Sequence, residues 1–98
     1  MTNRFGVEIT VISQTGVCAA GHKAGDKFKV YRHTPCDFCI FAYSAIEPDI
    51  RTLMFGGTYP WMQDKDAYIG CCPDPVNPVI FELRRIAMQE TINQETNE

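Results

Sequence analysis

Cysteine and histidine are the residue types in this sequence that point most directly toward chemistry. Thiolate sulfur and imidazole nitrogen are the ligands that zinc prefers, and iron accepts the same donors. An odd number of cysteines excludes complete internal pairing, and a reducing cytoplasm keeps thiols free. A single cysteine is often only a small core hydrophobe, but five in a short chain favour a shared chemical role. The 98-residue chain has two histidines and five cysteines, namely Cys18, Cys36, Cys39, Cys71 and Cys72.

The first two cysteine-containing segments each provide candidate ligands. Cys18 and His22 are separated by three residues in a glycine-rich segment, so both side chains can turn toward one ion. Cys36 and Cys39 form a CxxC pair at the expected start of a helix, where free N–H groups and the helix dipole favour a thiolate. A CxxC pair supports both metal ligation and dithiol–disulfide exchange, so both chemistries stay open at this point.

A third ligand is expected from the pair Cys71-Cys72, which ends a predicted strand. Neighbouring residues in a strand point to opposite faces, so one of the two thiols can reach a shared site and the other cannot. We favour Cys72 because it precedes the turn imposed by Pro73. The resulting hypothesis is a metal site with a Cys3His ligand set, in which zinc is favoured and iron or an iron–sulfur centre is possible: Cys18, His22, Cys39 and Cys72.

Two further residues are candidates for binding a cofactor or substrate beside this site. A structural zinc site is closed, whereas a catalytic one keeps an open position, here next to Trp61 or Asp74. The alternative function is a thiol-dependent enzyme or redox module, in which Cys39 or Cys72 is the nucleophile and His22 a base. A third hypothesis is a binding or accessory subunit whose cysteines only pack.

Strands and one helix are expected to position these side chains. Alternating apolar and polar residues predict strands, and the order strand, strand, helix, strand, strand predicts an α+β domain with an antiparallel sheet of about four strands. A thioredoxin-type oxidoreductase is disfavoured because that fold begins with a parallel βαβ unit. The expected strands cover 5–13, 27–32, 67–71 and 79–84.

The main helix is predicted from an apolar stripe that runs from Phe38 to Met54 at helical spacing. Pro48 interrupts the stripe, so we expect either a kink at Glu47 or two short helices nearly in line. The N-terminal cap is expected from Asp37 or Thr34, and the stop from Gly56-Gly57. The aromatic side chains expected in the core are those of Phe38, Phe41, Phe55 and Trp61, with a lid over a pocket as the alternative for Trp61.

Composition limits the partners. The chain has 9 Lys+Arg and 12 Asp+Glu, and three of the acids lie in its last ten residues. Because phosphate binding requires a surplus of basic residues on one face, nucleic acid is not an expected partner. The apolar stretches are too short for a membrane span, and no apolar h-region follows Arg4, so a cytoplasmic protein is expected. Unpaired strand edges favour a homodimer. We expect one domain over 1–88 and a polar, acidic, disordered tail over 89–98.

Five separated motifs occur in an order that resembles a family of short, functionally uncharacterised prokaryotic proteins of roughly this length. The resemblance covers about residues 7–86 and brings no established activity. The motifs are Gly16-Val-Cys-Ala-Ala-Gly-His-Lys-Ala-Gly-Asp26, Cys39-Ile-Phe-Ala42, Gly56-Gly57 with Pro60-Trp61, Cys72-Pro-Asp-Pro75 and Asn77-Pro-Val-Ile-Phe81.

The resemblance implies a shared cysteine and histidine site. Cys36 and Cys71 are extra relative to the family pattern, which weakens the case for a working CxxC dithiol. The positions that match the pattern are Cys18, His22, Cys39, Trp61, Cys72 and Asp74.

Overall fold

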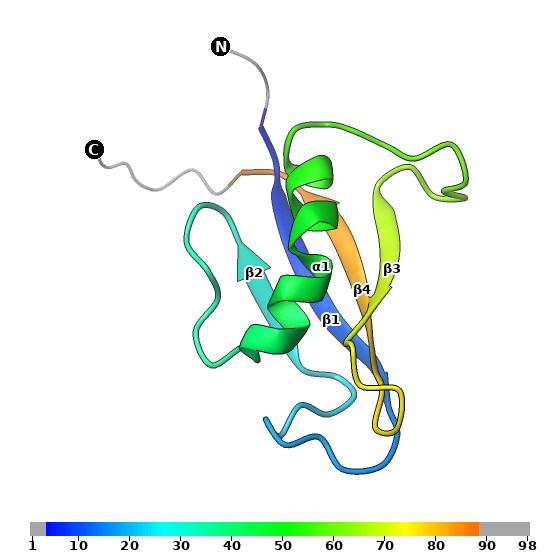
Figure 1. Ribbon diagram of the computed structural model, residues 1–98. Coiled ribbons are helices and arrows are strands. Elements are labelled where there is room, and N and C mark those ends of the chain that lie inside the picture. Colours follow the sequence, from blue (N-terminus) through cyan, green and yellow to red (C-terminus); the bar gives the residue numbers. More distant parts are fainter. Residues whose placement is uncertain (1–3, 89–98) are drawn as a thin grey trace.

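A four-stranded antiparallel sheet with one helix against it makes up the fold. The computed structural model describes residues 4–88, so the predicted tail lies outside the described residues. The strand order in the sheet is β2-β1-β4-β3, and α1 covers one face (Figure 1). The predicted α+β architecture is therefore confirmed. The elements are β1 (Gly6–Gln14), β2 (Lys27–Val30), α1 (Ile40–Met54), β3 (Ala67–Cys71) and β4 (Val79–Ile86).

Alternation along the two central strands separates an apolar face from a polar one. Ile9 on β1 pairs with Leu83 on β4, and both are fully buried beneath the helix. On the opposite face Lys27 lies 3.9 Å from the carboxylate of Glu8. Side chains of successive strand residues point to opposite faces, so the period-2 pattern of the sequence translates directly into these two surfaces. The register shifts between Val11 and Ser13, which places a bulge near the end of β1.

The helix packs an apolar stripe onto the sheet. A Cβ added to Gly70 of β3 would lie 2.9 Å from Cγ2 of Ile46, so the absence of a side chain at this glycine lets α1 pack closely against β3. The helix is continuous through Pro48, and the prediction of two short helices is wrong. Burial on both sides of the proline maintains the helix although one backbone hydrogen bond is missing. The buried stripe consists of Ala42, Ile46, Ile50, Leu53 and Met54.

The two ends of α1 differ from each other. Cys39 is the N-cap residue and no side chain caps the helix, so the predicted cap from Asp37 or Thr34 is wrong. At the other end Gly56 has φ +80°, and its N–H donates to the Leu53 carbonyl, as predicted for a glycine stop. Within residues 4–88, no helix is long and apolar enough to cross a membrane.

Three of the four aromatic residues predicted for the core are exposed. Phe41 is next to the buried stripe but points outward, and Phe55 follows the last helical turn; their exposed fractions are 71% and 58%. Trp61 is 65% exposed and stacks on Tyr59 with ring centroids 4.9 Å apart. Only Phe38 packs against the core. The apolar stripe of a helix is about 100° wide or more, so the sequence pattern did not decide whether Phe41 or Ala42 faces the sheet.

Arg85 holds the C-terminal end of α1 against the sheet. Its Nη1 donates to the Leu53 carbonyl and its Nη2 to the Gly57 carbonyl, each at 3.1 Å. Its Nε lies 3.2 Å from the carboxylate of Asp66, and the side chain is only 6% exposed. An arginine guanidinium satisfies several carbonyls at once because its five N–H groups lie in one plane.

Replacing Ile46 by alanine is expected to destabilise the fold by about 2–5 kcal/mol, because it leaves a cavity between α1 and Gly70 of β3. The measurement is the free energy of unfolding from urea denaturation. Ile40→Ala is the matched control: it is the same substitution on the same helix at a side chain that is 71% exposed, and its effect should stay within about 0.5 kcal/mol. Equal effects of the two substitutions would contradict the observed packing.

Candidate functional site

A pocket with a volume of about 270 Å³ lies where the start of α1 meets the loops 15–26 and 72–78. These three segments lie at one end of the molecule (Figure 1). The wall is largely apolar, with side chains such as those of Phe41, Ala42, Val79 and Phe81. The predicted site residues that line the pocket are Cys18, His22, Cys39, Cys72 and Asp74.

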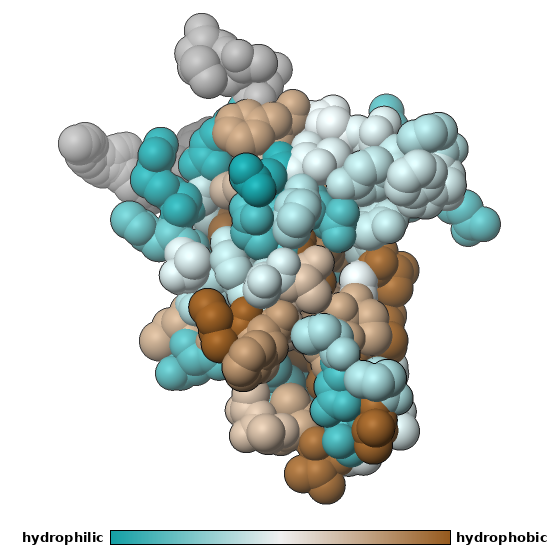
Figure 2. Space-filling view, in the orientation of Figure 1, coloured by the Kyte–Doolittle hydropathy of each residue, from teal (hydrophilic) through white to brown (hydrophobic). Residues whose placement is uncertain are grey.

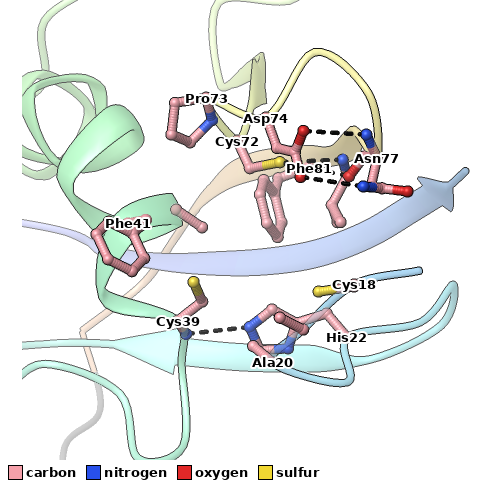
Figure 3. A pocket seen from close by; sticks show the side chains of 13 residues that line it. Cys18, Ala20, His22, Cys39, Phe41, Cys72, Pro73, Asp74, Asn77 and Phe81 are labelled. Atoms are coloured by element: carbon pink, nitrogen blue, oxygen red, sulfur yellow. Dashed lines mark hydrogen bonds between the residues drawn. The ribbon is translucent and has the colours of Figure 1, made fainter. Parts of the chain in front are cut away.

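The three pocket cysteines come from three different walls. Cys18 lies in the loop after β1, Cys39 immediately precedes α1, and Cys72 follows β3. Their sulfur atoms lie on different sides of the pocket (Figure 3). All three side chains are partly buried, whereas Cys36 and Cys71 are exposed, and all five thiols are free. Desolvation and the neighbouring Cys72 thiol raise the pKa of Cys71.

His22 joins the first loop to the start of the helix. Its Nε2 accepts a hydrogen bond of 3.0 Å from the backbone N–H of Cys39 (Figure 3), so the lone pair is on Nε2 and the ring proton belongs on Nδ1. The side chain is 5% exposed, and its ring packs against Phe28 and Phe38 with centroids 5.4 and 5.0 Å away. In this arrangement Nδ1–H is the group left to donate a hydrogen bond to another partner.

Hydrogen bonds fix the position of the Cys72 thiol. The Val79 N–H donates to Sγ at 3.3 Å, and Sγ donates to the Asn77 carbonyl at 3.9 Å. The hydrogen bond from Val79, the first residue of β4, therefore holds the Cys72 thiol beside the pocket.

The carboxylate of Asp74 shapes the same loop. Oδ1 accepts from the backbone N–H groups of Val76 and Asn77, at 2.9 and 3.1 Å, and Oδ2 accepts from the Asn77 side chain at 3.3 Å. These hydrogen bonds lower the pKa of Asp74 from its ordinary value of 3.8. Asp74 lines the pocket, and its two oxygens are used to hold the turn together.

Asn77 was not identified as a site residue from the sequence, although its side chain connects two loops that form walls of the pocket. Its Oδ1 accepts a 2.9 Å hydrogen bond from the Val17 N–H, in the loop that carries Cys18. The adjacent Gly16 has φ +71°, and a Cβ there would lie 2.1 Å from the same oxygen, so only glycine fits. The available signal was the Asn-Pro pair, which is typical of a turn; the partner on a loop about 60 residues away could not be read from it.

Trp61 does not line this pocket. It lies over a second hollow beside Tyr68 and Arg84, on the β3 side of the sheet. Across residues 4–88, no three histidine, cysteine, aspartate or glutamate side chains are close enough together to hold a metal ion.

Apolar side chains are exposed around this end of the molecule. In Figure 2 the hydrophobic surface gathers over the lower half of the view, which contains the start of α1 and the two loops. Val17 and Val76 are 79% and 75% exposed, and Ile40 and Phe41 are 71% exposed. The pocket therefore opens within a surface that carries several exposed apolar side chains.

The fold and the pocket define a class: a small α+β domain in which three thiols line an apolar cavity. No family model matches the chain, and no curated protein or solved structure is detectably similar to it. The resemblance to the uncharacterised prokaryotic family therefore stays a prediction.

Replacing Asp74 by asparagine is expected to lower the free energy of unfolding at neutral pH, because an amide nitrogen would face the Asn77 amide. Since the folded-state pKa of Asp74 is lowered below 3.8, its contribution is complete above that value and is lost as the pH falls through the folded-state pKa. Urea denaturation at a series of pH values should therefore show the difference between the variant and the natural chain shrinking in acid. A difference that is constant from neutral to strongly acidic pH would contradict this role.

Proposed function

We propose that the pocket binds a metal centre through the thiolates of Cys18, Cys39 and Cys72, which lie too far apart in the described structure to meet at one ion without moving toward it. The observation that carries the proposal is that three free thiols from three separate segments line one cavity. Zinc and iron are the metals that suit sulfur donors of this kind. The proposal places the protein in a reducing compartment, the cytoplasm, because oxidised thiols do not ligate metals.

Two of the three cysteines lie beside backbone N–H groups. Cys39 lies at the start of α1, where the N–H groups of the first turn have no partner within the helix. Cys72 Sγ receives the Val79 N–H. N–H groups in such positions stabilise thiolates that are bound to a metal.

His22 and Asp74 have different places in this proposal. In the described arrangement His22 is not a ligand, because Nε2 accepts the Cys39 N–H and Nδ1 then carries the ring proton and has no lone pair to give. Asp74 borders the pocket with a carboxylate engaged in its own turn, so it shapes the site and holds Cys72 in place. Trp61 lines a different hollow and is not part of the proposed metal site.

Metal analysis of the protein purified under anaerobic conditions tests the proposal. We expect close to stoichiometric zinc or iron in the natural chain and about a tenfold loss in Cys18→Ser, Cys39→Ser and Cys72→Ser, because each removes one of few ligands. Cys36→Ser and Cys71→Ser are the matched controls and should retain the metal. Absence of any transition metal, together with failure to take one up, would contradict the proposal.

The second candidate function is thiol catalysis, and the position of Cys39 favours it. Cys39 lies at a helix N-terminus and faces an apolar cavity large enough for a small substrate. His22 does not serve as its base in the observed arrangement, since the imidazole accepts the backbone N–H of Cys39. Cys72, which also lines the cavity, is the other candidate nucleophile.

Thiol labelling resolved by mass spectrometry tests this second function. Below pH 7, Cys39 or Cys72 should react with iodoacetamide about tenfold faster than the exposed thiols if one of them is a nucleophile. Cys71 is the internal control, because its raised pKa makes it slow although it is exposed. Uniform, slow labelling of all five thiols would exclude thiol catalysis and leave metal binding unaffected.

The free edges of the sheet are compatible with a homodimer, in which the partner is a second copy of this chain. The strands at the two edges of the sheet are β2 and β3, and each has one side without a hydrogen-bonded neighbour in the described sheet. A second copy would pair along one of these edges.

A further inference from the structure

We propose that the metal centre is a four-iron, four-sulfur cluster held by Cys18, Cys39 and Cys72, with one iron left open to a small ligand. The inference rests on the proposed function and deepens it, since it names the kind of metal centre. Its grounds are the placement of the three thiols, the size and lining of the cavity between them, and the hydrogen bonds already made by neighbouring side chains.

The first ground is the arrangement of the sulfurs around a volume. A single tetrahedral zinc ion with bonds of about 2.3 Å requires its ligand sulfurs to lie about 3.8 Å from one another. Here the three thiols belong to different walls of a cavity of about 270 Å³ and lie on different sides of it (Figure 3). A cluster takes one thiolate on each of several irons, so its ligands surround a volume instead of meeting at a point.

The second ground is the wall between the thiols. It is formed largely by apolar side chains, including Ala20, Ala42, Val79 and Phe81. The hydrophobic shell around a metal centre is one of the factors that set the reduction potential of a cluster. The carboxylate of Asp74 borders the cavity but accepts three N–H groups within its own turn, so it adds no free oxygen ligand.

The third ground is the supply of N–H groups to an anionic centre. Val79 N–H donates to Cys72 Sγ, and Cys39 lies where the N–H groups of the first turn of α1 are unpaired within the helix. Hydrogen bonds to the sulfurs are among the factors that stabilise and tune iron–sulfur clusters. His22 Nε2 accepts the Cys39 N–H and Nδ1 carries the ring proton, so neither imidazole nitrogen is free to ligate and the protein supplies three thiolates to the four irons.

Loading of the site is a ligand exchange that requires no oxidant or reductant. A cluster carried by small thiolates exchanges three of them for the three cysteines. Each protein thiol gives its proton to the departing small thiolate as the new iron–sulfur bond forms. The oxidation states of the irons do not change, and the fourth iron keeps an exchangeable ligand that faces the pocket.

The experiment is anaerobic purification of the full chain, followed by incubation of the metal-free form with a synthetic four-iron cluster ligated by small thiolates. Iron, acid-labile sulfide, zinc, visible absorption and Mössbauer spectra are measured. We expect a brown protein with about four irons and four sulfides per chain, one iron being spectroscopically distinct. Each of Cys18→Ser, Cys39→Ser and Cys72→Ser should reduce the bound iron about tenfold, whereas Cys36→Ser and Cys71→Ser should retain it.

The outcomes separate this inference from the proposed function. One zinc or one iron without sulfide, lost in the same three variants, would overturn the cluster and leave the proposed metal site standing. No metal or cluster bound under either condition would overturn both. Circular dichroism of the metal-free variants tests whether they are folded. If a serine variant does not fold, the corresponding alanine variant and the spectrum of the natural chain, in which one iron differs from the other three, still decide the outcome.

Discussion

The hydrogen bond from the Cys39 N–H to Nε2 of His22 is the contact on which the candidate site most depends. It joins residues 17 positions apart and closes the first loop onto the start of α1. The ring of His22 is buried among Phe28, Phe38 and Phe81, so the bond lies in a region of low polarity where an unpaired N–H would be costly. Because Cys18 lies on that loop and Cys39 begins the helix, this single contact places two of the three thiols on one cavity.

The third thiol reaches the cavity through a second set of polar contacts. Asp74 organises the β3–β4 loop through backbone N–H groups, and Asn77 connects that loop to the N–H of Val17. The charged and amide groups near the pocket are therefore occupied mainly in building it. The three pocket cysteines pack partly against the hydrophobic core, and among the described residues Cys72 alone of the three has side-chain hydrogen bonds.

The histidine illustrates how one residue type supports different functions. A histidine four residues after a cysteine is compatible with a metal ligand set, and His22 lines the pocket. Its buried, aromatic surroundings and its bond to a backbone N–H also make it part of the core. Spacing along the chain does not distinguish these two roles, since both require the side chain to point inward.

Much of this architecture was determined by the sequence itself, because it depends on local periodicity. Alternation at Val7, Ile9 and Val11 and the helical stripe through Ile46 and Ile50 each express how a regular backbone presents side chains, and both were predicted correctly. Alternation also predicted that only one of Cys71 and Cys72 faces a shared site, and Cys72 was preferred because it precedes Pro73; Cys72 lines the pocket. Only the tertiary structure decided which loops lie together: that Asn77 meets Val17, that Arg85 holds the end of α1, and that Trp61 lies away from the thiols. These contacts join segments far apart in the chain, and no local pattern of residues encodes the meeting of two distant loops.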